Sequence, residues 1–262
     1  VRCGASLIIN PGCKIFFANN SAIFVEGNLQ AEATSWSDSI VFQGLRLEPF
    51  YEDNPGQWFG ITFLRNSSCK PTGIFNHCIV NESSYGIYAG ASAEFTTIGS
   101  FLGTANRAKV TIKNTIVKNS QFNAIYGFNA EIEAENSIFY AAGDYLVNLA
   151  LGGDYKFKNC TLFNVGSKFV SHEKEALFLG NFAIDGAQSV FTEPIRSVFT
   201  NCVIYGSLKN EVSFNNIQDF NLAQFDNSFS YSLIKSQQDT FNLFTTVHTD
   251  NVFNQEPLFK KS

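Results

Sequence analysis

A short sequence pattern recurs six times between residues 75 and 234, at residues 75–80, 112–117, 134–139, 157–162, 199–204 and 229–234. Each copy has an apolar first position, a polar or aromatic third position, a small residue at the fourth position and mostly apolar residues after it. Asn114, Asn136 and Asn159 are separated by 22 and 23 residues, and the longer separations elsewhere indicate the same unit with inserted loops. A period near 22 residues with short strands predicts a parallel β-solenoid, in which each coil stacks on the one before.

The third position of the pattern is asparagine in the four central copies, Asn114, Asn136, Asn159 and Asn201, between His77 in the first copy and Tyr231 in the last. Asparagine enters the left-handed backbone region more readily than other non-glycine residues. We therefore expect a sharp turn at this position and hydrogen bonds between asparagine side chains of successive coils. The alternative, a row of amides that binds a ligand, is less favoured.

Stacking of the copies predicts which side chains lie above one another. One outward row contains Lys113, Glu135, Lys158 and Thr200, and a second contains Lys109, Glu131, Asp154 and Arg196. The inward row contains Phe75, Ile112, Ala134, Phe157, Phe199 and Phe229. A ladder of small residues follows the turn, at Cys78, Thr115, Ser137, Cys160, Cys202 and Ser232. Opposite charges outside and apolar groups inside are what parallel stacking in register requires.

The N-terminal third fits the same scheme less regularly, with strands expected at residues 7–9, 14–17, 23–25, 29–31, 40–42 and 61–64. We see no linker or change of composition, so residues 1–262 are expected to form a single domain. The chain begins at Val1 without an initiator methionine, and we expect it to be a processed or trimmed chain. The fold class predicted is all-β: a single-stranded right-handed parallel β-helix of about nine coils with loop insertions.

The repeat resembles the right-handed parallel β-helix of the pectate-lyase-like superfamily, whose coils often carry an asparagine ladder. More narrowly, residues 10–12, 25–27, 42–46, 55–58 with 60–61, and 151–155 look like segments of uncharacterised secreted or lipid-anchored β-helix proteins of Bacteroidetes-type bacteria. The resemblance implies an extracellular or cell-envelope location. It carries no assigned activity.

Composition excludes several other classes of protein. With 45% hydrophobic residues, 16% charged residues and 28 phenylalanines, the chain is not expected to be disordered. A net charge of −5 argues against a nucleic-acid partner. No apolar run reaches the roughly 18 residues of a membrane-spanning helix.

The six cysteines contain no CxxC pair, so a zinc or thioredoxin-type site is not expected. Six in 262 residues are too few for a disulfide scaffold. We expect buried free thiols, which pack as small apolar groups.

In lyases of the resembled superfamily, the catalytic groove lies along one sheet and needs carboxylates for calcium and an arginine or lysine base. We expect that sheet to include residues 86–89, 124–128 and 146–150, with Tyr88, Tyr126 and Asn148 facing outward. No carboxylate is expected there, so the groove departs from the enzyme pattern and we favour a protein without catalysis. Tyr88 and Tyr126 would place two adjacent aromatic rings on the outer face, where they could stack against sugar rings. Alternatively, they pack beneath the insertion at residues 91–107.

The loop at residues 46–58 is a second candidate for ligand binding, because it concentrates aromatic and acidic side chains, including Tyr51, Asp53 and Trp58. The alternative is that Phe50 and Trp58 only cover the side of the solenoid. Glu131 and Asp154 are predicted neighbours that would suit Ca²⁺, although a mixed-charge surface ladder explains them as well. His172 and His248 have no serine or cysteine partner that the sequence identifies, so no catalytic triad is inferred.

The leading expectation for function is an extracellular or cell-surface module that binds a polysaccharide or cell-surface glycan, with no cofactor other than Ca²⁺ as a candidate. One alternative is a polysaccharide lyase or glycoside hydrolase, which would need two carboxyl groups in a cleft, such as Asp53 with Glu48 or Glu131 with Asp154. The other is a structural stalk or adhesin segment.

Overall fold

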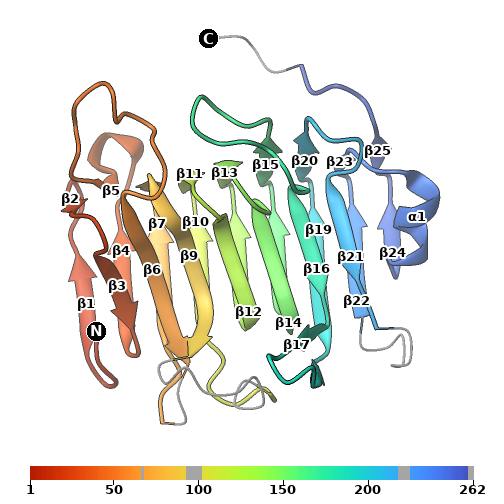
Figure 1. The fold of residues 1–262 in the computed structure, drawn as a ribbon, viewed down its shortest axis with the longest axis horizontal. Helices are drawn as coiled ribbons and strands as arrows, with labels where there is room; N and C mark the ends of the chain where they lie inside the picture. Colours follow the sequence, from red (N-terminus) through yellow and green to blue (C-terminus); the bar gives the residue numbers. More distant parts are fainter. Residues whose placement is uncertain (66–67, 93–101, 218–224, 259–262) are drawn as a thin grey trace.

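The computed structural model describes residues 1–65, 68–92, 102–217 and 225–258, and these residues form an almost entirely β structure (Figure 1). The strands lie side by side along the longest axis of the molecule, in sequence order from the N-terminal end to the C-terminal end. Two parallel sheets contain all but two of the described strands. No described helix is both long and apolar enough to cross a bilayer.

The larger sheet, called here the large sheet, contains β1 (Ser6–Ile9), β3 (Ala22–Val25), β4 (Asn28–Glu32), β6 (Trp58–Arg65), β7 (Thr72–Asn76), β9 (Ser83–Ser92), β10 (Lys109–Lys113), β12 (Asn123–Glu135), β14 (Val147–Lys158), β16 (Leu177–Gly180), β19 (Ile195–Thr200), β21 (Val212–Asn215), β22 (Phe225–Ser230) and β24 (Val247–Thr249). The other sheet, called here the small sheet, contains β2 (Lys14–Phe17), β5 (Ile40–Gly44), β8 (Cys78–Asn81), β11 (Ile116–Ser120), β13 (Ile138–Ala142), β15 (Thr161–Asn164), β20 (Val203–Gly206), β23 (Leu233–Ile234) and β25 (Val252–Phe253). Outside them lie the antiparallel pair β17 (Phe182–Ile184) and β18 (Val190–Thr192), a 3₁₀ turn at Trp36–Asp38 and the helix α1 (Gln238–Leu243).

The chain alternates between the two sheets in a regular way. One or two strands of the large sheet are followed by one strand of the small sheet, and strands pair in parallel with their equivalents in the next repeat, as β10 pairs with β12 and β11 with β13. In β12 and β14 the chain runs through the large sheet in one long strand before it turns. This topology is compatible with a β-helix or solenoid, and all six strands expected in the N-terminal third are present.

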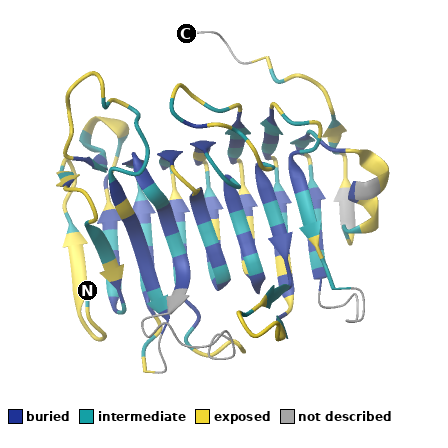
Figure 2. Ribbon diagram, viewed as in Figure 1, coloured by how far each residue is buried: buried dark blue, intermediate teal, exposed yellow. Residues whose placement is uncertain are grey.

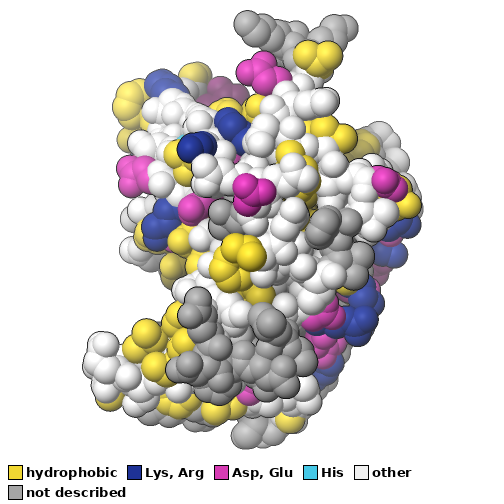
Figure 3. Space-filling model, turned by 90° about the vertical axis from the view of Figure 1, so that its right-hand side faces the viewer, with side chains coloured by type: hydrophobic (Ala, Val, Ile, Leu, Met, Phe, Trp, Pro, Cys, Tyr) yellow, Lys and Arg dark blue, Asp and Glu magenta, His cyan; other side chains and the backbone are white. Residues whose placement is uncertain are grey.

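The register of the strands confirms the predicted rows. Lys109 pairs with Glu131, Glu131 with Asp154, and Asp154 with Arg196, and the row from Lys113 to Thr200 is in register in the same way. Seen from the C-terminal end, Lys and Arg side chains alternate with Asp and Glu along one edge of the molecule (Figure 3). The alternation places opposite charges on adjacent strands, which is the favourable arrangement.

The predicted asparagine ladder is present. The backbone φ angle is positive at all six third positions, from 45° at Asn114 to 55° at Asn159. Asn159 Nδ2 donates to Asn136 Oδ1 at 3.0 Å, and Asn201 Nδ2 donates to Asn159 Oδ1 at 2.7 Å. At the first copy, Asn114 Nδ2 donates to Asn76 Oδ1 instead of the His77 ring.

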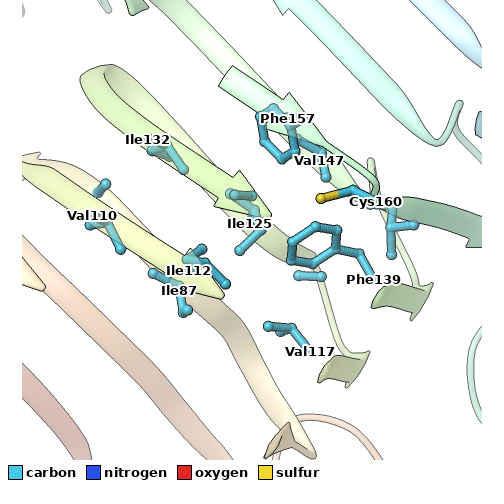
Figure 4. Packing of buried hydrophobic residues seen from close by; sticks show 14 of the residues in the cluster. Ile87, Val110, Ile112, Val117, Ile125, Ile132, Phe139, Val147, Phe157 and Cys160 are labelled. Atoms are coloured by element: carbon cyan, nitrogen blue, oxygen red, sulfur yellow. The ribbon is translucent and has the colours of Figure 1, made fainter. Parts of the chain in front are cut away.

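The core lies between the two sheets. Burial alternates along the strands (Figure 2), and the predicted inward row is buried throughout. Side chains from β9, β10, β12 and β14 meet those of β11 and β13 across the interior (Figure 4). The rings of Phe157, Phe199 and Phe229 are stacked, with centroids 4.9 and 4.8 Å apart.

The cysteines differ in part from expectation. Cys78, Cys160 and Cys202 are free and buried, as predicted, and Cys13 is free and half-buried. Cys3 and Cys69, however, form a disulfide across a separation of 66 residues. The prediction of free thiols was wrong for this pair, because stacking brings together two segments that carry no common motif.

Candidate functional site

Aromatic side chains form a patch on the outer face of the large sheet. Tyr88 pairs in register with Tyr126, and Tyr126 pairs with Asn148, as the sequence predicts. The rings of Tyr88 and Tyr126 are stacked, with centroids 4.5 Å apart and planes 26° apart. On the next strand, Phe178 pairs with Asn148 and its ring lies 4.8 Å from that of Tyr145.

The patch extends beyond the predicted residues toward the N-terminal end. The Tyr85 ring lies 5.1 Å from that of Phe122, 5.5 Å from that of Phe59 and 5.6 Å from that of Tyr88. Phe59 in turn lies 6.2 Å from Phe24. Phe24, Phe59 and Phe122 are exposed. We define these residues as the aromatic surface: Phe24, Phe59, Tyr85, Tyr88, Phe122, Tyr126, Tyr145 and Phe178.

A bulge explains why the sequence did not predict Tyr85. Tyr85 and Tyr88 are three residues apart, so strict alternation places them on opposite faces. In the structure Gly60 pairs with Tyr85 and Ile61 with Ile87, which leaves Gly86 as an extra residue in β9. A Cβ at Gly86 would lie 2.4 Å from the Ala124 carbonyl oxygen, so only glycine fits at this point of the bulge.

Polar groups accompany the aromatic rings. Asn148 Oδ1 is buried and has no hydrogen-bond partner among the described residues. Asp144 forms an ion pair of 2.8 Å with Lys174, whose ammonium lies 4.9 Å from the Tyr145 ring centroid. Burial, followed by the nearby Tyr85 and Asp144, raises the pKa of Tyr126 to about 12, so its hydroxyl stays protonated at neutral pH.

The alternative in which the tyrosines pack beneath residues 91–107 falls largely on residues 93–101, outside the described part of the chain.

A pocket of about 550 Å³ lies between the loop at residues 46–58 and the outer face of the small sheet. Asp53 lines it, and its Oδ1 accepts hydrogen bonds from Lys118 Nζ at 2.9 Å and Asn119 Nδ2 at 2.7 Å. Tyr51 lies beneath the guanidinium of Arg46, 3.8 Å from the ring centroid. The loop therefore brings Asp53 to a pocket, where Lys118 compensates the negative charge of its carboxylate.

Trp58 lies in the core. It is 1% exposed, its ring stacks on Phe17 at 4.0 Å, and its Nε1 donates to the Asn81 carbonyl oxygen at 2.8 Å. Trp58 thus has a structural role, but inside the core and not as a cover over the side of the solenoid, and Phe50 of the same loop is 68% exposed. The indole offers no free face to a ligand in this conformation.

Glu82, which the sequence analysis missed, holds the loop in place. Its carboxylate accepts backbone N–H groups from Asp53 at 3.0 Å and Gly44 at 3.2 Å, and its own φ is 64°. Burial raises the pKa of Glu82, while those two hydrogen bonds oppose the shift. Glu48, by contrast, pairs with Arg46 at 3.2 Å on the exposed side of the loop.

Glu131 and Asp154 are neighbours in register, as predicted, but each has a cationic partner. Lys70 Nζ lies 2.8 Å from Glu131 Oε1, and Arg107 Nη1 lies 2.7 Å from Asp154 Oδ2. Both carboxylates line a shallow pocket of about 250 Å³. Among the described residues, no group of three or more His, Cys, Asp or Glu side chains has the geometry to hold a metal ion.

His172 has partners that the sequence did not reveal. Its Nδ1 lies 2.7 Å from Ser207 Oγ, and its Nε2 lies 3.3 Å from Glu211 Oε2. Both partners belong to the loop between β20 and β21, more than 30 residues further along the chain. The sequence could not identify these partners, because loops of neighbouring repeats meet without a repeated motif. The side chain of His248 is outside the described part of the structure.

A comparison of the chain with protein-family models, curated proteins and solved structures found no match. Function is therefore inferred from the chemistry of the surfaces described above.

Proposed function

We propose that the protein is a right-handed parallel β-helix of about nine coils that acts outside the cell and binds a polysaccharide along the aromatic surface. The observation that carries this proposal is the continuity of that surface across several strands of the large sheet. Aromatic rings provide flat apolar faces, and tyrosine adds a polar edge. A sugar ring presents the matching combination of an apolar face and peripheral hydroxyl groups.

The arrangement suits an extended ligand better than a compact one. Neighbouring parallel strands are about 4.8 Å apart, so a row of rings across several strands presents repeated contacts along one line. Asn148 lies in that row and has an acceptor oxygen without a partner among the described residues, which a sugar hydroxyl would satisfy.

The Cys3–Cys69 disulfide supports the extracellular location. Disulfides persist in oxidising compartments and are rare in the cytosol. This argument is independent of the resemblance to secreted β-helix proteins.

A polysaccharide array, with and without Ca²⁺, tests the proposal. We expect Phe122→Ala to weaken binding about tenfold, equivalent to about 1.4 kcal/mol, because it removes an exposed ring from the aromatic surface. Phe16→Ala is the matched control: both side chains are 40% exposed, but Phe16 lies at the pocket on the small sheet.

Equal binding by Phe122→Ala and wild type would contradict the proposal. A loss confined to Phe16→Ala would transfer binding to the pocket beneath the loop at residues 46–58. Release of reducing or unsaturated ends from a bound polysaccharide would favour the hydrolase or lyase alternative, and no binding at all would favour the stalk.

A further inference from the structure

Ser207, His172 and Glu211 form a line of three side chains that runs from the surface into the interior. Ser207 is exposed, whereas the His172 side chain is 2% exposed and the Glu211 side chain is fully buried. The two ring nitrogens of His172 contact the other two residues, one on each side, at 2.7 and 3.3 Å. Nε2 is buried and forms no hydrogen bond among the described residues, so its 3.3 Å contact with Glu211 Oε2 is a close approach and not a hydrogen bond.

Glu211 is held firmly by the backbone. Its Oε2 accepts the Ala176 N–H at 3.0 Å and its Oε1 accepts the Leu208 N–H at 2.8 Å. A Cβ at residue 206 would lie 2.3 Å from Oε1, so Gly206 leaves room for the carboxylate. These contacts hold the carboxylate in place and keep Oε2 3.3 Å from His172 Nε2.

We propose that Ser207 is the nucleophile of an ester hydrolase, with His172 as general base and Glu211 as the positioning residue. An exposed nucleophile, a base within hydrogen-bond reach of it and a third group that orients the base form the arrangement that serine hydrolases require. That arrangement is recognised by geometry and roles, independently of fold and sequence order. Either nitrogen of an imidazole can act as the general base, and in this site Nδ1 faces the serine.

The reaction proceeds in two balanced steps. Ser207 Oγ attacks the ester carbonyl carbon while its proton passes to His172 Nδ1; the C–O bond to the alcohol then breaks, and the alcohol leaves with that proton. Water attacks the acyl-serine, passing a proton to Nδ1, and the C–Oγ bond breaks as Ser207 takes the proton back. The net products are one alcohol and one carboxylic acid. Lys235 Nζ donates to the carbonyl oxygen of Gly206, the residue before Ser207.

The substrate class follows from the position of this site, and this part rests on the proposed function. Ala176, which binds Glu211, is two residues before Phe178 of the aromatic surface, a distance of about 7 Å along an extended chain. A polysaccharide bound along the aromatic surface would place substituents near Ser207. We therefore assign short acyl esters carried on a glycan as the substrate.

The test uses the full chain with 4-nitrophenyl acetate, a fluorophosphonate probe and an O-acetylated xylan. Wild type is expected to hydrolyse the first, to be labelled by the second at Ser207 and to release acetate from the third. Ser207→Ala should lose labelling and at least about 100-fold in kcat/KM, and His172→Ala about 10²- to 10⁴-fold. Ser171→Ala is the matched control, because Ser171 is also exposed and adjoins His172 in sequence; it should retain full activity.

Glu211→Gln separates a positioning role from a structural one. Loss of the carboxylate removes the group that lies beside the imidazole, so kcat for 4-nitrophenyl acetate should fall about tenfold while KM stays unchanged. A loss of folded protein alone would lower the fraction of chains that the fluorophosphonate probe labels and leave kcat per labelled chain unchanged.

Two results would overturn the proposal: a wild-type chain that neither takes up the probe nor hydrolyses 4-nitrophenyl acetate, or a Ser207→Ala variant that retains the activity. The glycan assignment fails separately if the small ester is hydrolysed but acetate is not released from xylan. Phe122→Ala should still hydrolyse 4-nitrophenyl acetate, and Ser207→Ala should still bind polysaccharide, so failure of one proposal is distinguishable from failure of the other.

Discussion

The asparagines at the turns between the sheets combine two properties in one side chain. Asn159 has a φ of 55°, which costs most L-residues about 1–2 kcal/mol, and its amide joins two neighbouring repeats. It donates to Asn136 and accepts from Asn201, so one residue contributes both to the turn and to the stacking.

Substitutions at Asn159 separate these two contributions. Asn159→Gly should destabilise the protein by about 1 kcal/mol, because glycine adopts the backbone conformation but loses the hydrogen bonds. Asn159→Ala should cost about 1 kcal/mol more, since it adds the left-handed penalty. Urea unfolding of both variants measures the difference. Equal stability of the two variants would show that the turn conformation carries no cost here.

At the scale of the elements, stacked phenylalanines connect successive strands of the large sheet. Phe199 in β19 lies between Phe157 in β14 and Phe229 in β22, with interplanar angles of 12° and 6°. Because the strands are parallel and in register, each ring contacts its equivalents on both sides. The column thus links strands that are 30 and 42 residues apart in sequence.

Removal of the central ring of this column should be costly. Phe199 is fully buried, so Phe199→Ala is expected to lower the free energy of unfolding by about 3–5 kcal/mol. Phe199→Leu, which retains most of the volume, should cost about 1.5 kcal/mol or less. Denaturant titration checks both values, and a cost below 1 kcal/mol for Phe199→Ala would contradict tight packing of the column.

At the scale of the whole molecule, the N-terminal end of the large sheet is poorly protected from solvent. Three of the four residues of β1 are exposed, and β1 pairs with β4. The disulfide connects Cys3, just before β1, with Cys69, just before β7, which is the strand beyond β4. The disulfide therefore links the segment before β1 to the segment before β7, across β4. This link limits fraying of the sheet from its N-terminal end.

Removal of the disulfide should destabilise this end. We expect the double variant Cys3→Ser/Cys69→Ser to lose about 2–4 kcal/mol of stability in urea, because the unfolded chain regains the freedom of a 66-residue loop. Wild type treated with a reductant should coincide with the double variant. Cys13→Ser, which removes a half-buried free thiol, should change stability by about 0.5 kcal/mol or less. If the double variant matched wild type, the disulfide would have no stabilising role.

Much of the fold could be predicted from the repeated positions. The register of Lys109, Glu131, Asp154 and Arg196, the inward phenylalanines and the asparagine ladder all follow once the copies are aligned. The contact between Tyr88 and Tyr126 follows in the same way. In a parallel stack, equivalent positions of successive copies are spatial neighbours. An alignment of the copies therefore predicts which residues are in contact.

Only the tertiary structure decided the features that lie outside the repeat. The bulge at Gly86 brings Tyr85 to the outer face, the packing against Phe17 buries Trp58, and the loops after β15 and β20 bring Ser207 to His172. Inserted loops have no common length or register, so their contacts depend on how each folds over the sheets. The sequence by itself determined the stacked scaffold, because periodic positions must meet, whereas the aperiodic segments acquired their partners only in three dimensions.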